Sequence, residues 1–220
     1  ETGVAEADAQ LDEGADWARG HFYESGLKAV VPKLGFLFTP QRFGGGMFNF
    51  LAMLHQAGVT TALDMGTGIY GNPVGEIAGV RAAANAYPVP VRLILTPIIV
   101  DFLTRGKTPE EALAEILEWQ TANGDRVMVG NHFKLMIDGA IFSGLAQMGP
   151  PGYLDGHEGV WMVSEPMLRA YSEVFWRAGF QLHAHANGDA AVDRFLRLVE
   201  GLQQDFPRPD HRLSLIHISE

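Results

Sequence analysis

The sequence predicts an α/β fold of repeated strand–helix units around a parallel sheet, and three observations support this prediction. Strand-like and helix-like hydrophobic patterns alternate about four times along the 220 residues. One stretch, FQLHAHANGDAAVD at residues 180–193, has the pattern of a complete strand–turn–helix junction. No P-loop pattern follows a predicted strand. The first two observations fit a doubly wound sheet or a (β/α)8 barrel, and the third favours the barrel.

The predicted strands are runs of strand length with either alternating or continuous apolar character. Residues 59–65 (VTTALDM) are rich in β-branched side chains. Residues 91–99 form an apolar run that is typical of a strand buried on both faces. Residues 127–138 and 180–187 alternate, so that each has two faces of different polarity.

The predicted helices have apolar stripes and recognisable first turns. Thr108 is expected to cap a helix over 109–124, with Pro109 at its first position. Asp189 is expected to cap a helix over 190–204. The remaining helices are predicted over 47–56, 73–86 and 165–178. Because a whole barrel takes about 250 residues, four units indicate a partial barrel.

Composition excludes several classes of protein. The formal net charge is −10 and the 16 basic residues are scattered, so we expect no nucleic-acid partner. There is no cysteine, which restricts metal ligands to His, Asp, Glu or a modified Lys. No apolar run is long enough to cross a bilayer and no signal-peptide pattern marks the start. We therefore expect no membrane partner and a cytoplasmic location.

Polar residues on the strand at 127–138 are the first candidate site. In HFKLMIDGAIFSG, His132, Lys134, Met136 and Asp138 share one face of the strand. A lysine pointing into a barrel is costly to bury as an unpaired charge. Two interpretations remain open, namely a salt bridge to Asp138 or a carboxylated Nζ that bridges two metal ions.

The strand at 180–187 carries the second candidate site. His183 and His185 are two residues apart and therefore lie on one face, and Asn-Gly-Asp follows them. The strand's C-terminal end is where α/β barrels keep their chemistry. We interpret this pair as functional, with core histidines as the alternative. Asp64 is expected to be an inward polar residue, whereas structural or surface roles are expected for His21, His55 and His157.

Three segments, AGVTTALDMG, FKLMIDGAIFSG and HAHANGDAAVD, resemble the amidohydrolase superfamily, in particular its N-substituted formamide deformylase-like branch. The resemblance covers most of residues 20–212. The third segment is the most specific, because the family pattern there is His, Ala, any residue, Gly, Asp. The three segments would correspond to the second, fourth and fifth strands of a (β/α)8 TIM barrel. The chain would then hold about strands two to five plus the start of strand six.

The resemblance implies a site and a reaction. His185 fits the family's metal-ligand position, Lys134 fits its strand-four lysine, and both would be catalytic, with His183 as a further candidate ligand. A divalent metal, expected to be zinc, would activate water to hydrolyse a C–N bond of an amide-type small molecule. Family members also use an HxH pair on strand one and an Asp on strand eight. This chain has neither, so we expect it to be inactive by itself.

The two ends of the chain are expected to lie outside the family-like segment. Residues 1–20 are acidic, and we predict a loosely packed N-terminal segment whose natural start lies upstream. The last residues, LSLIHISE, equal one reading frame of a common transposase-type sequencing adapter. We therefore predict a partial amidohydrolase barrel domain over 21–212 and an adapter-derived tail over 213–220, in which His217 imitates a strand-six ligand.

Two further hypotheses compete with this one. The chain could be a non-catalytic α/β domain that binds a ligand or partner through its strand-end loops. It could also be a barrel hydrolase without metal, for which Glu165 and Asp189 are the available acids. An incomplete barrel leaves strand edges unpaired, so we expect self-association into homo-oligomers.

Overall fold

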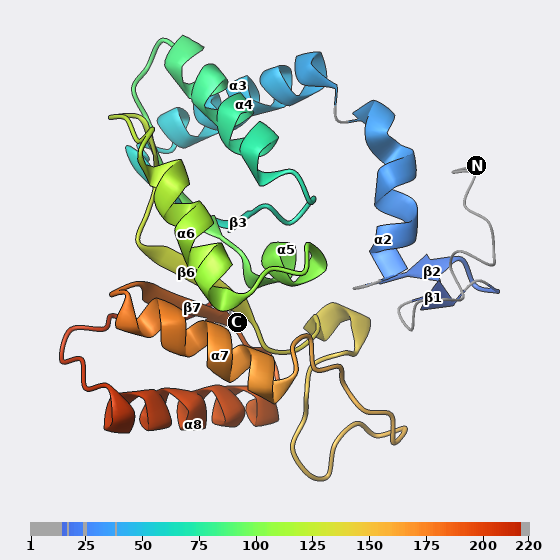
Figure 1. Cartoon of the computed structure of the whole chain (residues 1–220). Coiled ribbons are helices and arrows are strands. Elements are labelled where there is room, and N and C mark those ends of the chain that lie inside the picture. Colours follow the sequence, from blue (N-terminus) through green and yellow to red (C-terminus); the bar gives the residue numbers. More distant parts are fainter. Residues whose placement is uncertain (1–14, 17, 24–25, 38, 217–220) are drawn as a thin grey trace. The chain divides into compact units, whose positions relative to one another are not determined.

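The structure is a computed structural model that describes residues 15–16, 18–23, 26–37 and 39–216 (Figure 1). The chain divides into two compact units, Glu1–Asn49 and Phe50–Glu220. Within the part of the chain that the structure describes, no helix combines the length and the apolar character that a membrane span requires.

The first unit contains a short hairpin followed by helical turns. Strand β1 (Ala15–Asp16) pairs antiparallel with β2 (His21–Phe22). The helical elements are α2 (Leu27–Val30), η2 (Val31–Leu37) and the start of α3 (Pro40–Gln56). Helix α3 begins at Pro40, earlier than the predicted 47–56, because glycines 44–46 lower helix propensity in the sequence and yet adopt helical geometry.

The second unit alternates strands and helices in chain order, as predicted. Its strands are β3 (Thr61–Thr67), β4 (Arg92–Pro97), β5 (Val127–Val129), β6 (His132–Met136), β7 (Gln181–His185) and β8 (Ser214–Ile216). Its helices are α4 (Pro73–Ala86), α5 (Ile99–Thr104), α6 (Pro109–Gln120), η3 (Ile141–Ser143), α7 (Glu165–Arg177) and α8 (Asp189–Asp205). The result is a mixed α/β fold.

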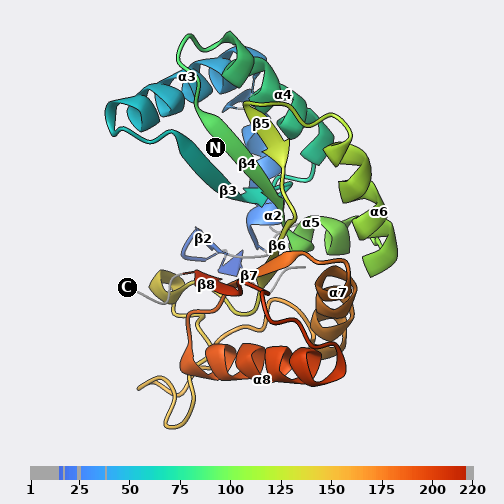
Figure 2. The same ribbon diagram turned by 90° about the vertical axis from the view of Figure 1, so that its left-hand side faces the viewer.

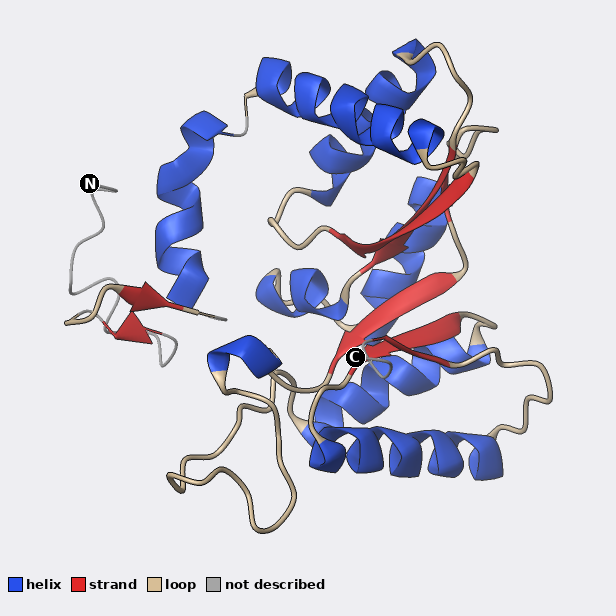
Figure 3. Cartoon of the chain, turned by 180° about the vertical axis from the view of Figure 1, so that it is seen from behind, coloured by secondary structure: helices blue, strands red, loops and turns tan. Residues whose placement is uncertain are grey.

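All strands of the second unit are parallel and follow the order of the chain. One sheet has the order β3-β4-β5 and the other has the order β6-β7-β8 (Figure 2). A parallel bridge between Ile98 and Lys134 links the end of β4 to β6. Helices α4, α6 and α7 lie on one side of these strands, and α8 lies beside α7 (Figure 3). This is the βα arrangement that the alternating sequence pattern predicts.

The strand predicted over 127–138 is in fact two strands, separated at Gly130 and Asn131. The first, β5, pairs with β4, whereas the second, β6, pairs with β7. A Cβ on Gly130 would lie 2.4 Å from Cδ2 of His132 and 2.8 Å from Cγ2 of Ile94. A larger residue at position 130 would therefore require these side chains to shift where the chain passes from one sheet to the other.

Helix starts were predicted correctly where a capping side chain is present. Thr108 and Glu111 form a capping box at the start of α6, and α4 has its predicted bounds. The prediction for Asp189 was wrong, because the N-cap of α8 is Gly188. Asp189 is instead the first helical residue, and its Oδ1 accepts hydrogen bonds from the backbone N–H groups of Gly149 and Ala190.

The strand predicted over 91–99 ends early. Strand β4 stops at Pro97, and the next apolar residues form α5. A buried apolar run does not by itself distinguish a strand from a short buried helix, since both faces are apolar in either case.

The core of the second unit lies between the helices and the apolar face of the strands. Phe133 on β6 is 0% exposed and stacks on Phe175 of α7, with ring centroids 3.7 Å apart. Tyr171 and Phe102 pack beside the same ring. The large buried side chains therefore hold α7 against the outer face of β6, and they leave the opposite face to polar residues.

Strand β8 comes from the segment predicted to be adapter-derived. Ser214, Leu215 and Ile216 pair in parallel with β7. A short segment can pair with an open strand edge whatever its origin, so the origin of 213–220 stays a prediction. His217 lies outside the described residues.

Replacing Phe133 by Ala is expected to reduce the free energy of unfolding by about 3–5 kcal/mol, because it leaves a cavity beside Phe175. Urea denaturation followed by circular dichroism measures the change. Phe142, 92% exposed, provides a matched control, and Phe142→Ala should change stability by less than about 0.5 kcal/mol. Equal losses in the two variants would contradict this account of the core.

Candidate active site

The registers of β6 and β7 decide which polar side chains share a face. Lys134 pairs with His183, and Met136 pairs with His185. Paired residues in a parallel ladder point to the same side, and residues two apart on one strand also point to the same side. Lys134, His183 and His185 therefore lie on one face, as their sequence spacing predicts, while the opposite face is apolar. Their chemical roles stay a prediction.

Lys134 is 5% exposed and its ammonium group is not paired with Asp138. No ion pair joins these two described residues, so the salt-bridge interpretation is wrong. The carboxylate of Asp138 accepts backbone N–H groups instead. Burial lowers the pKa of Lys134 from 10.5 to about 8. Roughly a tenth of this amine is uncharged at pH 7 at such a pKa.

His183 is also buried, at 3% exposed, and contacts a second histidine. Its Nε2 lies 2.9 Å from Nδ1 of His132, whereas its own Nδ1 is buried without a hydrogen-bond partner. Burial lowers the pKa of His183 to about 4, with smaller contributions from His132 and Lys134. The pKa of His132 is likewise lowered by burial. Both rings are therefore neutral at pH 7, and one nitrogen of the pair donates to the other.

His185 lies at the C-terminal end of β7 and is half-buried. Its Nε2 lies 3.0 Å from Nδ2 of Asn187. Asn187 was not among the residues predicted for the site, because the family pattern allows any residue at this position. His132 was placed on the correct face without a role, since its contact with His183 crosses between strands.

Asp138 connects the segments that follow β6 and β7. It is fully buried, at 0% exposed, and its carboxylate accepts three backbone N–H groups. Oδ2 lies 2.9 Å from N of Gln147 and 2.8 Å from N of Gly188, and Oδ1 lies 2.9 Å from N of Asn187. These bonds join the loop after β6 to the turn after β7. A Cβ on Gly188 would lie 1.8 Å from O of Gln147, so only glycine permits this approach.

In the loop at 139–159, two hydrogen bonds hold the ring of His157. Its Nδ1 lies 2.5 Å from Oδ1 of Asp155, and its Nε2 lies 2.6 Å from the carbonyl oxygen of Gly144. Tyr153 stacks on the ring at 4.0 Å. Both partners are acceptors, so both ring nitrogens carry a proton in this arrangement. These two bonds, first the one to Gly144, raise the pKa of His157.

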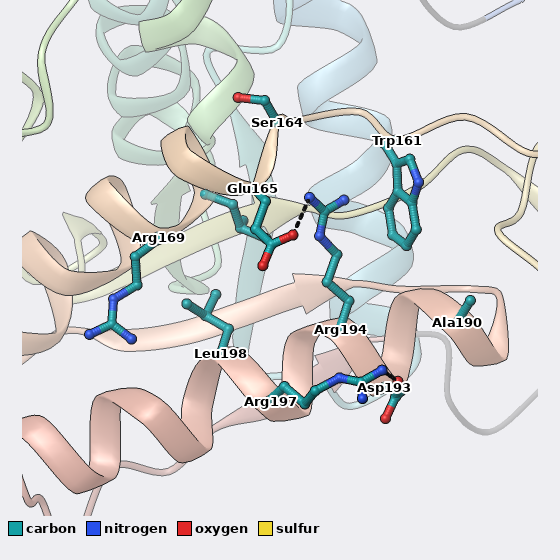
Figure 4. Close-up of a pocket in the computed structure, with 10 residues that line it drawn as sticks. Trp161, Ser164, Glu165, Arg169, Ala190, Asp193, Arg194, Arg197 and Leu198 are labelled. Carbon is teal, nitrogen blue, oxygen red and sulfur yellow. Dashed lines mark hydrogen bonds and ion pairs between the residues drawn. The ribbon is translucent and has the colours of Figure 1, made fainter.

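A groove of about 730 Å³ lies between α7 and α8, beside the helices (Figure 4). Arg194 reaches between Trp161 and Glu165, with its Cζ 4.2 Å from the Trp161 ring centroid and Nη2 3.4 Å from Glu165 Oε2. Lys134, His183 and His185 do not line this groove. Glu165 is engaged with Arg194, and Asp189 with the backbone, so the proposed metal-free acid pair finds no support.

The described residues do not bring a metal-binding group together. Among residues 15–16, 18–23, 26–37 and 39–216, no group of three or more His, Asp or Glu side chains is placed to hold a metal ion. The imidazoles of His183 and His185 and the amine of Lys134 nonetheless lie on one face of the strands. Nδ1 of His183 is buried without a hydrogen-bond partner and is therefore available as a ligand atom. Asp64 accepts hydrogen bonds from its neighbours Gly66 and Thr67.

Comparisons with known proteins give a consistent relationship. The sequence model of the amidohydrolase family matches residues 6–219. The fold is similar to uncharacterized metal-dependent hydrolases from Pyrococcus horikoshii OT3 and Pyrococcus furiosus, with TM-scores of 0.59 and 0.58 and 17% identity to each. These matches cover 86% and 90% of this chain. No curated protein matches the sequence significantly.

The chain spans about two fifths of the solved structures that it resembles, 37% of the first and 41% of the second. At 17% identity the likeness concerns the fold. The family match rests on sequence and extends over nearly the whole chain.

Replacing Asp138 by Asn is expected to lower the free energy of unfolding by about 2–4 kcal/mol, because a carboxamide cannot accept all three N–H groups. Urea denaturation measures the loss. Asp125, which is exposed, gives the matched control Asp125→Asn, expected within about 0.5 kcal/mol of wild type. A wild-type stability for Asp138→Asn would show that the three amides find other acceptors.

The bonds of His157 predict a pH-dependent loop. Because its pKa in the folded chain is raised above 6.5, its stabilising contribution is complete below about pH 6.5 and is lost as the pH rises through the raised value. Amide hydrogen exchange in 139–159, corrected for intrinsic rates, should speed up across this range. His157→Asn should remove that dependence, and an unchanged dependence in the variant would assign it to another group.

Proposed function

The chain belongs to the amidohydrolase family, and on this premise we propose that the complete protein is a metal-dependent hydrolase. Its reaction would be hydrolysis of a C–N bond, other than a peptide bond, in an amide-type small molecule. The observation that carries the proposal is the shared face of Lys134, His183 and His185 on two neighbouring parallel strands. The N-substituted formamide deformylase-like branch is part of this proposal and rests on the sequence segments alone.

The proposed architecture is a partial (β/α)8 barrel. Strands β3, β4, β5 with β6, β7 and β8 would be strands two to six of that barrel. Two features support this assignment, namely that neighbours in the sheets follow chain order and that all of their pairings are parallel. In such a barrel the polar face of β6 and β7 points inward and the apolar face meets the helices. The buried Phe133 and Leu135 on the helix side fit this arrangement.

Lys134 and His185 are the proposed catalytic residues, and both would hold the metal together with His183. Burial favours the uncharged amine of Lys134, whose lone pair can form an N–C bond with carbon dioxide while one proton leaves to solvent. The resulting carboxylated lysine would offer oxygen ligands. When bound, a divalent ion, for which we propose zinc, supplies Lewis-acid polarisation and activates water at neutral pH.

The residues of the loop at 143–159 are proposed to shape the substrate site. Asp138 ties this loop to the turn that follows His185, so the loop is held beside the proposed ligands. The charge of −10 makes nucleic acid an unsuitable partner. Strands β3 and β8 each pair on one side only within the described sheets, which supports the proposed self-association.

A non-catalytic ligand-binding domain is the second candidate. It is favoured by the lack of a three-residue metal group in the described part of the chain. The two candidates differ in one measurable property, because the complete hydrolase would purify with stoichiometric divalent metal and a binding domain would not.

The complete protein tests the proposed function directly. Lys134→Met and His185→Ala should each lower amide hydrolysis by more than about 100-fold, since loss of even a supporting residue of a metal site costs up to that factor. His55, which is exposed on α3, provides the matched control His55→Ala with unchanged activity. Full activity in Lys134→Met would overturn the site assignment.

For the 220-residue chain alone, we predict weak zinc binding and no hydrolase activity, because its described residues place no three His, Asp or Glu side chains together, whereas catalytic zinc normally uses three protein ligands. Calorimetric titration and metal analysis of the purified chain measure this. Any residual zinc binding should fall in His185→Ala and persist in His55→Ala. Tight stoichiometric zinc in the wild-type chain would mean that the ligands have been misassigned.

A further inference from the structure

The groove between α7 and α8 contains a guanidinium whose hydrogen-bond donors are only partly used. Arg194, on α8, extends into the groove between Trp161 and Glu165 (Figure 4). Its side chain is 17% exposed, so its guanidinium is largely removed from water. Within the described part of the chain, its Nε is buried and has no hydrogen-bond partner. Because buried donors are normally paired, the groove offers N–H groups that a ligand can use.

The contact between Arg194 and Glu165 is weak and easily exchanged. Nη2 of Arg194 lies 3.4 Å from Oε2 of Glu165, beyond the usual range for an N–H···O hydrogen bond. The Glu165 side chain is 78% exposed, so water solvates its carboxylate when the contact breaks. Exposed ion pairs contribute little to stability. The carboxylate of a ligand can therefore replace Glu165 at small cost.

Trp161 holds the guanidinium in position and adds an aromatic surface to the groove. Cζ of Arg194 lies 4.2 Å from the Trp161 ring centroid, which is a cation–π contact. Trp161 is itself 40% exposed, and Leu198 also lines the groove. The volume of about 730 Å³ is typical of a small-molecule site. A flat apolar group fits the chemistry of these walls.

The other two arginines of the groove already have carboxylate partners. Nη2 of Arg169 lies 2.6 Å from Oδ2 of Asp205, and Arg197 is paired with Asp193. Arg194 is thus the guanidinium that remains for a ligand. One guanidinium suits a single carboxylate better than a multiply charged phosphate, because its planar fork matches the two carboxylate oxygens.

We propose that the groove between α7 and α8 binds a small aromatic carboxylate. The carboxylate of the ligand accepts N–H groups of Arg194 in place of Glu165, and the ring packs against Trp161 and Leu198. The three proposed metal ligands on β6 and β7 do not line this groove. The site is therefore separate from the proposed active site, and the inference does not depend on the proposed function.

Benzoate is the probe, titrated at neutral pH into the ¹⁵N-labelled 220-residue chain. It should shift the indole N–H signal of Trp161, which is identified by its loss in Trp161→Phe, and the shift gives the Kd. Acetate has no ring, benzyl alcohol has no charge, and phosphate has neither the ring nor the planar shape. Each should bind at least about tenfold more weakly than benzoate, because it lacks one of the two contacts.

Two variants change the affinity in opposite directions. Arg194→Gln should weaken benzoate binding by about tenfold or more, because the charge-assisted hydrogen bonds are lost. Glu165→Gln should strengthen it by about threefold, because the competing carboxylate is removed. Arg177, 61% exposed on α7 and outside the groove, gives the matched control Arg177→Gln with unchanged affinity.

Amide spectra show whether each variant keeps the fold. If Arg194→Gln does not fold, Glu165→Gln decides, since its exposed side chain makes only the long contact with Arg194. Unchanged benzoate affinity in Glu165→Gln, or in a folded Arg194→Gln, would overturn the proposal. So would a Trp161 signal that benzoate leaves in place. Benzyl alcohol, acetate or phosphate binding as tightly as benzoate would overturn the assigned ligand class.

Discussion

The candidate site depends on one buried carboxylate. Asp138 accepts N–H groups from Gln147, Asn187 and Gly188, and it is 0% exposed. A buried carboxylate without such partners would be strongly unfavourable, whereas hydrogen bonds from several amides stabilise the charged form. The same three bonds determine where the loop after β6 and the turn after β7 come together. The polar face of β6 and β7 therefore ends in a fixed geometry and not in two independent loops.

The two faces of β6 have different surroundings, one apolar and one polar. Phe133 packs on Phe175 and holds the strand against α7, which fixes the direction of the alternate side chains. Lys134 on the other face is buried without a carboxylate partner, and the cost appears as a pKa lowered to about 8. A lysine reacts with carbon dioxide only through its uncharged amine. The burial of Lys134 thus supplies the desolvation on which the proposed chemistry rests.

Histidine contacts divide the polar face into two parts. His183 pairs with His132 deeper in the sheet, whereas His185 pairs with Asn187 at the strand end. Each of these two rings has one nitrogen in contact with a neighbouring side chain. The groove between α7 and α8 lies apart from these groups, because Trp161 and Arg194 face the helices.

The sequence by itself determined the elements whose signals are local. Alternation placed His183 and His185 on one face, and Thr108 with Pro109 defined the start of α6. Only the tertiary structure decided that residues 127–138 divide at Gly130, that Asp138 binds amides instead of Lys134, and that Asn187 contacts His185 from a fixed position. The bonds from His132 to His183 and from Asp138 to Asn187 and Gly188 join residues 49 to 51 positions apart. Periodicity and capping act within a few residues, so contacts at that separation follow from strand pairing and loop packing, which no local pattern encodes.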